Sequence, residues 1–222
     1  MALPALPRLR PSALPGTLSG RRLPRRSIQL LVGLFLYGIA IALIVRGQIG
    51  AAPWDVLTQG IALHTGLSFG VIVVLTSIVV LLFWIPLRQK PGIGTLLNAA
   101  LVGPAADVGL ALIPADMPLV ARILSFTAGL LLLAVATGLY VGAHLGPGPR
   151  DGLMTGLHRR TGWRIWIVRT GIEVVVVSIG WALGGNVGIG TLIFALAIGP
   201  LCQFTLPWLA VRMPEKRPLL VE

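Results

Sequence analysis

The chain has 222 residues, of which 55% are hydrophobic and only 11% are charged, and its formal net charge is +11. Ordinary soluble domains carry about a quarter charged residues, so this composition excludes them and indicates an integral membrane protein. A positive charge of this size would suggest nucleic acid in a soluble protein, so its placement relative to the apolar segments decides what it means.

Residues 1–27 are rich in proline and arginine and show no apolar periodicity. Such a segment buries too little apolar surface to fold, which predicts a disordered basic cytoplasmic tail in contact with anionic headgroups. The apolar run after Arg26 resembles the core of a secretory signal peptide, so a cleaved signal is the alternative. We expect no cleavage, because residues 33–43 match residues 129–139 of a later apolar run.

Six apolar runs are long enough to cross about 30 Å of hydrocarbon as helices. They cover residues 28–45, 67–87, 93–113, 119–141, 165–183 and 189–211. The first and the fourth run are each followed by a glycine-rich segment in which a proline precedes an acid by two positions, a pattern typical of a helix start. We therefore expect short helices at 53–64 and 149–160, lying at the membrane interface or dipping into it.

Two parts of the chain recur at one constant offset. The run GIGTL at 92–96 returns at 188–192, and residues 50–66 match residues 146–162 at seven positions 96 residues apart: Gly50, Pro53, Asp55, Leu57, Gly60, Thr65 and Gly66. Unrelated segments would not match without gaps at the same spacing, so the pattern predicts an internal duplication.

The duplication divides the chain into a first repeat at 28–116, a second at 117–212 and a short C-terminal tail at 213–222. Each repeat holds three spans, and an odd number of spans makes the two copies antiparallel, as in many secondary transporters. The expected fold is an all-α integral membrane protein with six transmembrane helices in two inverted three-helix repeats. In each repeat a short interfacial or re-entrant helix follows the first span.

Most basic residues fall on one side if the N-terminus is cytoplasmic. The cytoplasmic segments then hold the arginines of the tail, Arg88, Lys90, Arg150, Arg159, Arg160, Arg164, Arg212, Lys216 and Arg217. This is the positive-inside pattern, and it predicts an inner (plasma) membrane protein with both termini in the cytoplasm. No basic patch with interleaved aromatic residues lies outside these flanks, so we expect no nucleic-acid partner.

Several segments carry a family resemblance. GAAPWDVL at 50–57, GLSFG at 66–70 and GIGT at 92–95, followed by Gly103 and Asp107, resemble the YczE/YitT-like family of bacterial integral membrane proteins. The resemblance extends over about residues 28–211 and is more specific in the first repeat. It implies a bacterial inner-membrane protein and carries no substrate and no catalytic residues.

Asp107 is a candidate substrate or ion site inside the third span, where small neighbours leave room for close packing or for a cavity. Its repeat partner is Gln203, which keeps the hydrogen bonding but not the charge. Pro104 and Pro200 each remove a helix hydrogen bond, and helix breaks of this kind often mark transporter sites. The alternative is a packing kink with a hydrogen-bonded aspartate.

Arg169 and Glu173 lie four residues apart in the fifth span and therefore share one helix face. They form either a mutually neutralising pair, with Arg169 reaching toward the cytoplasm, or a proton or cation relay at Glu173. Their repeat partners are uncharged, so the pair is particular to the second repeat.

Asp55 and Asp151 are charged residues duplicated in place, and each stands at the start of a short helix. A helix-start acid is the structural interpretation. The functional interpretation makes them matching gates on opposite faces, in two vestibules that also contain Thr95 and Thr191 of the GIGT turns.

Enzyme motifs are missing from the sequence, and we expect no catalytic residues, no metal ligands and no cofactor.

The leading hypothesis is a transporter-like protein for an unidentified small solute, coupled to protons or cations through Asp107 or Glu173. The alternative is a non-transporting scaffold or regulator that binds a partner protein. Expected partners are membrane lipid and a small-molecule or ion substrate, with a homodimer or a partner membrane protein left open. A polar cavity that reaches Asp107, Gln203 or Glu173 would favour transport, and dry, paired packing would favour the scaffold.

Overall fold

The computed structural model describes residues 23–211, and every regular element in that range is an α-helix. The helices are α1 (Leu23–Gly47), α2 (Pro53–Thr65), α3 (Phe69–Trp84), α4 (Ile93–Leu112), α5 (Leu119–Gly142), α6 (Pro149–Thr161), α7 (Ile165–Ala182) and α8 (Ile189–Leu209). Most of the predicted N-terminal tail and all of the predicted C-terminal tail lie outside the described residues. α1 begins at Leu23, before the predicted start of the first span.

Five helices, α1, α4, α5, α7 and α8, are long and apolar enough to cross a membrane. The chain is therefore a multi-pass membrane protein. The predicted second span is the shorter α3, which has 16 residues. α2 and α3 pass the test of length and composition together, but a bend of 115° separates them, so they form a broken span or a re-entrant segment.

The two short helices form where the sequence predicts them. α2 and α6 each have 13 residues and begin with a proline, whose missing N–H is one of the donors that a helix start leaves unpaired. Each ends at a glycine in the left-handed conformation, Gly66 at φ 69° and Gly162 at φ 73°. Glycine adopts this conformation without strain, so both helices stop there and the chain turns.

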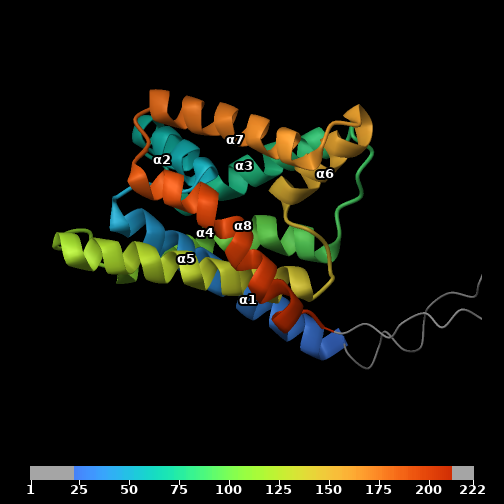
Figure 1. Cartoon of the computed structure of the whole chain (residues 1–222), viewed down its shortest axis with the longest axis horizontal. Helices are drawn as coiled ribbons and strands as arrows, with labels where there is room; N and C mark the ends of the chain where they lie inside the picture. Colours follow the sequence, from blue (N-terminus) through green and yellow to red (C-terminus); the bar gives the residue numbers. More distant parts are fainter. Residues whose placement is uncertain (1–22, 212–222) are drawn as a thin grey trace, which may run out of the picture.

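The helices form two layers (Figure 1). α1 packs along α5 and α4 in the lower layer, while α2 and α7 pack together in the upper layer beside α3 and α6. α3 also contacts α4, and α8 crosses in front and packs on α5. The side chains between α1, α4 and α5 form the main apolar core, which includes Leu34, Ile41 and Leu133.

The start of α4 is hydrogen-bonded to the loop before α6, and the start of α8 is hydrogen-bonded to the loop before α2. Gly94 N donates to Leu145 O at 2.9 Å, and Gly190 N donates to Ile49 O at 2.8 Å. Each loop then passes through a glycine with positive φ, Gly50 and Gly146. These reciprocal contacts set the positions at which α2 and α6 begin.

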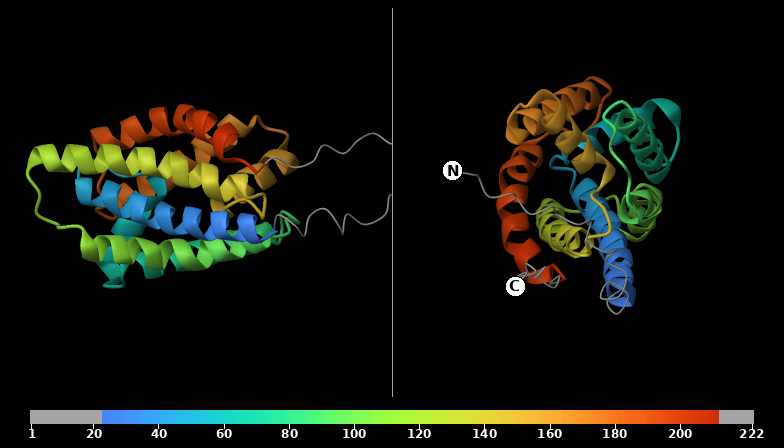
Figure 2. Two further views of the ribbon diagram at one scale, coloured as in Figure 1. Left: turned by 90° about the horizontal axis from the view of Figure 1, so that it is seen from below. Right: turned by 90° about the vertical axis from the view of Figure 1, so that its right-hand side faces the viewer.

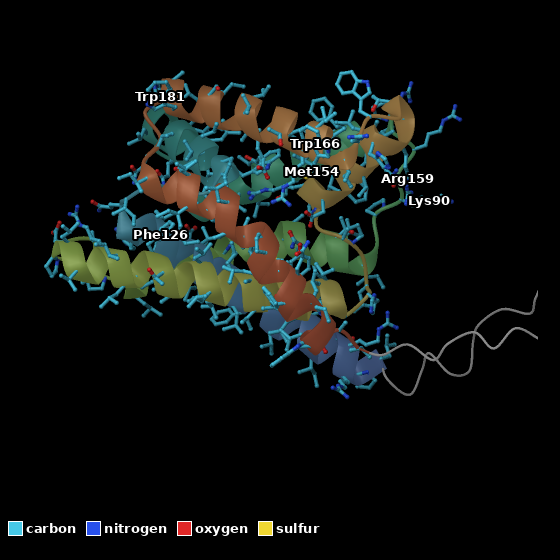
Figure 3. The ribbon with its side chains drawn as sticks, in the orientation of Figure 1. Lys90, Phe126, Met154, Arg159, Trp166 and Trp181 are labelled. Atoms are coloured by element: carbon cyan, nitrogen blue, oxygen red, sulfur yellow. The ribbon has the colours of Figure 1, made fainter. Side chains whose placement is uncertain are left out.

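The start of α1 and the end of α8 lie at the same end of the bundle (Figure 2). Gln29 Nε2 donates to Leu209 O at 2.7 Å and so joins them directly. Lys90 and Arg159 lie at this end too, and Trp181 lies at the other end (Figure 3).

Two residues at this basic end are buried rather than solvent- or interface-exposed. Arg26, which the sequence places in the tail, is only 6% exposed and donates from Nε to Ala143 O at 2.8 Å. Trp84 is 2% exposed and donates to Pro149 O at 3.0 Å. Trp84 therefore holds the start of α6 in place.

Candidate functional site

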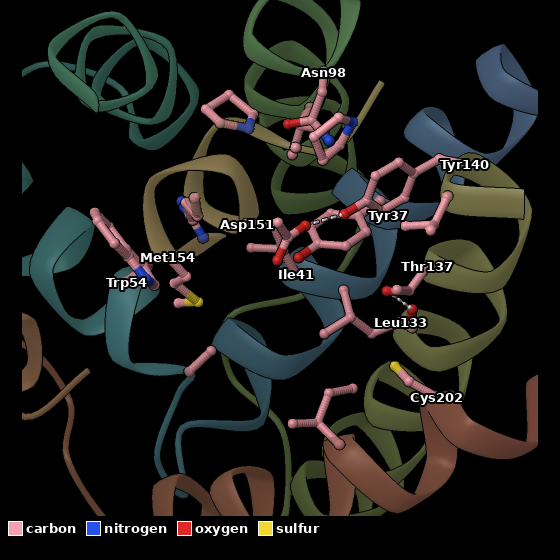
Figure 4. A pocket seen from close by; sticks show the side chains of 18 of the residues that line it. Tyr37, Ile41, Trp54, Asn98, Leu133, Thr137, Tyr140, Asp151, Met154 and Cys202 are labelled. Carbon is pink, nitrogen blue, oxygen red and sulfur yellow. Dashed lines mark hydrogen bonds between the residues drawn. The ribbon is translucent and has the colours of Figure 1, made fainter. Parts of the chain in front are cut away.

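A cavity of about 520 Å³ lies between the two layers, and residues from all eight helices line it. Its volume falls in the range of small-molecule sites, about 300–1,000 Å³. The polar and aromatic residues that line it are Tyr37, Trp54, Asp55, Ser77, Asn98, Thr137, Tyr140, Arg150, Asp151, Arg169, Glu173, Cys202 and Gln203. Several come together in the close view of Figure 4.

The first turns of α2 and α6 meet at this cavity, and they bring Asp55 and Asp151 to it. The Asp55 side chain is only 2% exposed, and its Oδ1 accepts no hydrogen bond from any residue between 23 and 211. Its nearest counter-charge is Arg150 Nη1 at 3.8 Å, beyond hydrogen-bond distance. The duplicated aspartates, predicted as gates on opposite faces, thus line one shared cavity.

Arg150 is one of the cavity residues that the sequence did not point to as part of a site. Its side chain is 20% exposed, and its guanidinium carbon lies 5.0 Å from the centroid of the Trp54 ring, within cation–π range. The sequence placed Arg150 among the cytoplasmic basic residues. The available signal was its position, because Arg150 precedes Asp151 as Trp54 precedes Asp55.

Two tyrosines line the cavity beside Asp151 (Figure 4). Tyr140 donates its hydroxyl to Asp151 Oδ2 at 2.8 Å. Tyr37 packs edge-to-face on Tyr140, with ring centroids 5.6 Å apart. Asn98, which also lines the cavity, lies above this pair in the same view. Asp151 is thus oriented by an aromatic pair that no local sequence pattern predicts.

Arg169, Glu173 and Gln203, three of the predicted site residues, line the same cavity. Arg169 Nε donates to Glu173 Oε1 at 2.9 Å, and the two side chains are 47% and 22% exposed. The pair is therefore joined as the neutralising interpretation requires, and it also faces the cavity as the relay interpretation requires.

Asp107, the other predicted site residue, lies elsewhere and caps α3. Its Oδ2 accepts from Ser68 Oγ at 2.6 Å and its Oδ1 from Gly70 N at 2.7 Å, so it satisfies donors at the helix start. It borders a shallow apolar groove with Val71, Val74 and neighbouring residues. Asp107 thus has the contacts expected of a hydrogen-bonded packing residue.

The remaining candidates hold turns and helices. Thr95 Oγ1 accepts from Gly92 N at 3.2 Å and donates to Pro147 O at 2.7 Å, and Thr191 Oγ1 accepts from Gly188 N at 3.3 Å. α4 and α8 continue as helices through Pro104 and Pro200. These two prolines therefore do not end their spans.

The chemistry available in the cavity is binding by charge and hydrogen bonds. Within residues 23–211, no three His, Cys, Asp or Glu side chains come close enough together to hold a metal ion. Cys202 is a free thiol on the cavity wall. The fold and the cavity together define a multi-pass helical membrane protein with a charged central cavity, in which two short helices begin.

The chain belongs to a family of unknown function, DUF6198, whose match covers residues 24–207. It is 40% identical over 186 residues to an uncharacterised protein of Haemophilus influenzae, covering 84% of this chain and 85% of the relative. It is 33% identical over 177 residues to the uncharacterised membrane protein YczE of Bacillus subtilis, covering 79% and 82%. The resemblance to YczE-like membrane proteins is thereby confirmed. No solved structure matches the chain.

Proposed function

We propose that this protein is a transporter-like membrane protein for a small solute, whose binding site is the central cavity. The observation that carries the proposal is the cavity itself, about 520 Å³ in volume and lined by five acidic or basic side chains, Asp55, Arg150, Asp151, Arg169 and Glu173, between the two layers. A scaffold has no need of such a space, because unpaired polar groups inside a bilayer cost free energy unless they face water or a ligand.

We further propose that the chain is an inverted repeat in which α1–α4 correspond to α5–α8. The support comes from matched pairs of contacts: the packing of α1 on α4 matches that of α5 on α8, and α2 on α7 matches α6 on α3. The reciprocal turn contacts at Gly94 and Gly190 fit the same symmetry. Transporters of this architecture bind the solute between the repeats and expose it alternately by rocking them.

Two corresponding positions, Gly103 in α4 and Gly199 in α8, are packed differently, and this difference supports alternating access. α3 and α4 touch at Gly70 and Gly103, where an added Cβ on either glycine would collide with the other backbone. The counterpart of Gly103 is Gly199 in α8, where an added Cβ would meet nothing within 4 Å. Rocking that closes one helix pair while it opens the other would exchange these two arrangements.

The orientation proposed is an inner-membrane protein with both termini in the cytoplasm. The end of the bundle that holds the start of α1 and the end of α8 also carries Lys90 and Arg159 (Figure 3), as the positive-inside rule requires of the cytoplasmic side. The cavity lining extends toward this end, to Val141 and Leu206 near the ends of α5 and α8. The structure would then represent an inward-facing state.

A thermal-shift screen tests the proposal, because a ligand that binds only the folded protein stabilises it by about 2.7 kcal/mol at 100 times its dissociation constant. The purified protein is screened against metabolites and ions, and each compound found is measured for uptake into proteoliposomes. Stabilisation lost in Asp151→Asn, together with uptake by the native protein, is expected. Absence of stabilisation by every compound, with a specific partner protein bound instead, would favour the scaffold.

A further inference from the structure

The ionisable groups around the central cavity leave a net negative charge. Three carboxylates, Asp55, Asp151 and Glu173, face two guanidinium groups, Arg150 and Arg169. Glu173 and Arg169 neutralise each other at 2.9 Å. Among the lining residues of the described part of the chain, Asp55, Asp151 and the cation Arg150 remain, which leaves one uncompensated negative charge when all these groups are ionised. A fixed charge removed from water is costly, and it favours a ligand of opposite sign.

Two residues that line the cavity at the start of α2 each hold a buried polar atom without a hydrogen-bond partner. Among the described residues, nothing donates a hydrogen bond to Asp55 Oδ1 and nothing accepts one from Trp54 Nε1. Unsatisfied buried groups of this kind cost free energy, so they indicate a site that a ligand completes. The acceptor suits a cationic donor, and the indole N–H suits a hydroxyl or carbonyl oxygen on the same ligand.

Arg150 shows which chemistry this site accepts. Its guanidinium lies over the Trp54 ring at 5.0 Å and 3.8 Å from Asp55, so the protein's own side chain already places a planar organic cation against an aromatic face and a carboxylate. Asp151 offers a second carboxylate beside the Tyr37–Tyr140 pair, and within residues 23–211 it forms no salt bridge. Carboxylates beside aromatic rings are the usual environment for organic ammonium ligands.

An anionic ligand fits the same cavity less well. The N-termini of α2 and α6 point their partial positive charge toward it, which would favour an anion if those ends were free. Asp55 and Asp151 occupy the first turns of these two helices and already supply the negative charge. An added anion would have to displace or neutralise both carboxylates.

We infer that the central cavity binds a small organic monocation, an ammonium or guanidinium compound, at Asp151 and Asp55, with Arg150 as a tethered cation that competes with it. This inference specifies the class of solute that the proposed transporter would carry. Its claim about transport rests on the proposed function. Binding itself is a separate property and is measured separately.

Calorimetry on the purified protein tests the binding step, with choline and methylguanidinium as cationic probes. The uncharged isostere of choline, 3,3-dimethyl-1-butanol, tests whether charge or shape is recognised, and sodium chloride at equal ionic strength is the salt control. We expect the cations to bind and the isostere to bind at least about tenfold more weakly. Equal binding of choline and its isostere, or binding of neither cation, would overturn the inference.

Two variants separate the tethered cation from the acceptors. Arg150→Gln removes the competing charge, so it should tighten cation binding by about tenfold, while Arg159→Gln on the same helix should leave it unchanged. Asp151→Asn should weaken binding by about tenfold, while Asp116→Asn, in the loop before α5, should not. Weaker cation binding in Arg150→Gln, with tighter binding of acetate to the native protein, would make Arg150 an anion ligand and refute the proposal.

Proteoliposome uptake distinguishes this inference from the proposed function. Cation binding that depends on Asp151, without uptake, would support the inference and refute transport. Uptake of a neutral or anionic solute, without cation binding, would support transport and refute the inference. Uptake of radiolabelled choline that Asp151→Asn abolishes supports both.

Discussion

Arg150 Nη1 lies 3.8 Å from Asp55 Oδ1, and the two residues stand in the first turns of the two short helices, far apart in the chain. The contact joins α2 to α6 across the central cavity. Because the Asp55 side chain is 2% exposed, the guanidinium is the counter-charge that makes its burial tolerable.

Removing Arg150 should destabilise the protein. Arg150→Ala leaves the Asp55 carboxylate without a counter-charge in a low dielectric, and we expect a loss of roughly 2–3 kcal/mol in the free energy of unfolding. Adding Asp55→Asn should recover much of it, because the buried group is then neutral. Unfolding of the purified variants in detergent, monitored by circular dichroism, gives the double-mutant cycle. Additive losses would show that the two residues are not coupled.

The Arg169–Glu173 pair makes a corresponding prediction in α7. If its role is structural, Arg169→Ala should cost roughly 1–3 kcal/mol by leaving Glu173 unpaired, and adding Glu173→Gln should restore stability. If Glu173 is a relay, Glu173→Gln alone should keep the fold and abolish solute uptake. Melting temperature and proteoliposome uptake are measured on the same preparations. A double variant no more stable than Arg169→Ala would remove the structural account.

Asp107→Ala should destabilise the start of α3 without affecting the central cavity. The carboxylate accepts hydrogen bonds from Ser68 and Gly70, so its loss should cost roughly 1–2 kcal/mol, as for other helix caps. Ligand binding by the folded fraction should stay unchanged, because Asp107 does not line the central cavity. Calorimetry on the variant checks this, and weaker binding at equal folded concentration would return Asp107 to the solute site.

Two glycines at corresponding positions should respond differently to the same substitution. Gly103→Ala places a Cβ against the backbone of Gly70 and should destabilise by more than about 2 kcal/mol. Gly199→Ala meets open space and should be neutral or stabilising by up to about 1 kcal/mol, as expected for alanine in a helix. Thermal unfolding compares them. If α7 and α8 close during transport, Gly199→Ala should also slow uptake, which Gly171→Ala, another open position, should not.

Membrane orientation is tested by single cysteines at positions 88 and 116, in a background where Cys202 is replaced. With both termini in the cytoplasm, a membrane-impermeant thiol reagent applied to intact cells should label position 116 only, because the loop before α5 is then outside. Labelling after lysis is the control for accessibility at position 88. Modification at 88 in intact cells would mean the reverse orientation.

The amino-acid sequence alone determined the membrane class, the approximate spans and the two short helices. Hydrophobic length, a proline at a helix start and a glycine at a helix end act within a few residues, so α2 and α6 appear where the local pattern predicts them. The second span is the exception in length, because α3 begins only after its cap at Ser68 and ends at Trp84, short of the predicted residue 87.

Only the tertiary structure decided which charged residues meet. The sequence left two interpretations of Asp107, and the packing of α4 on α3 brings its carboxylate to the start of α3, as the interpretation of a hydrogen-bonded aspartate requires. Arg150 was predicted as a cytoplasmic flanking residue, because sequence position reports the distance to a span end and not the direction in which a side chain points. That direction depends on packing between distant helices, which brings Asp55, Arg150 and Asp151 into one cavity.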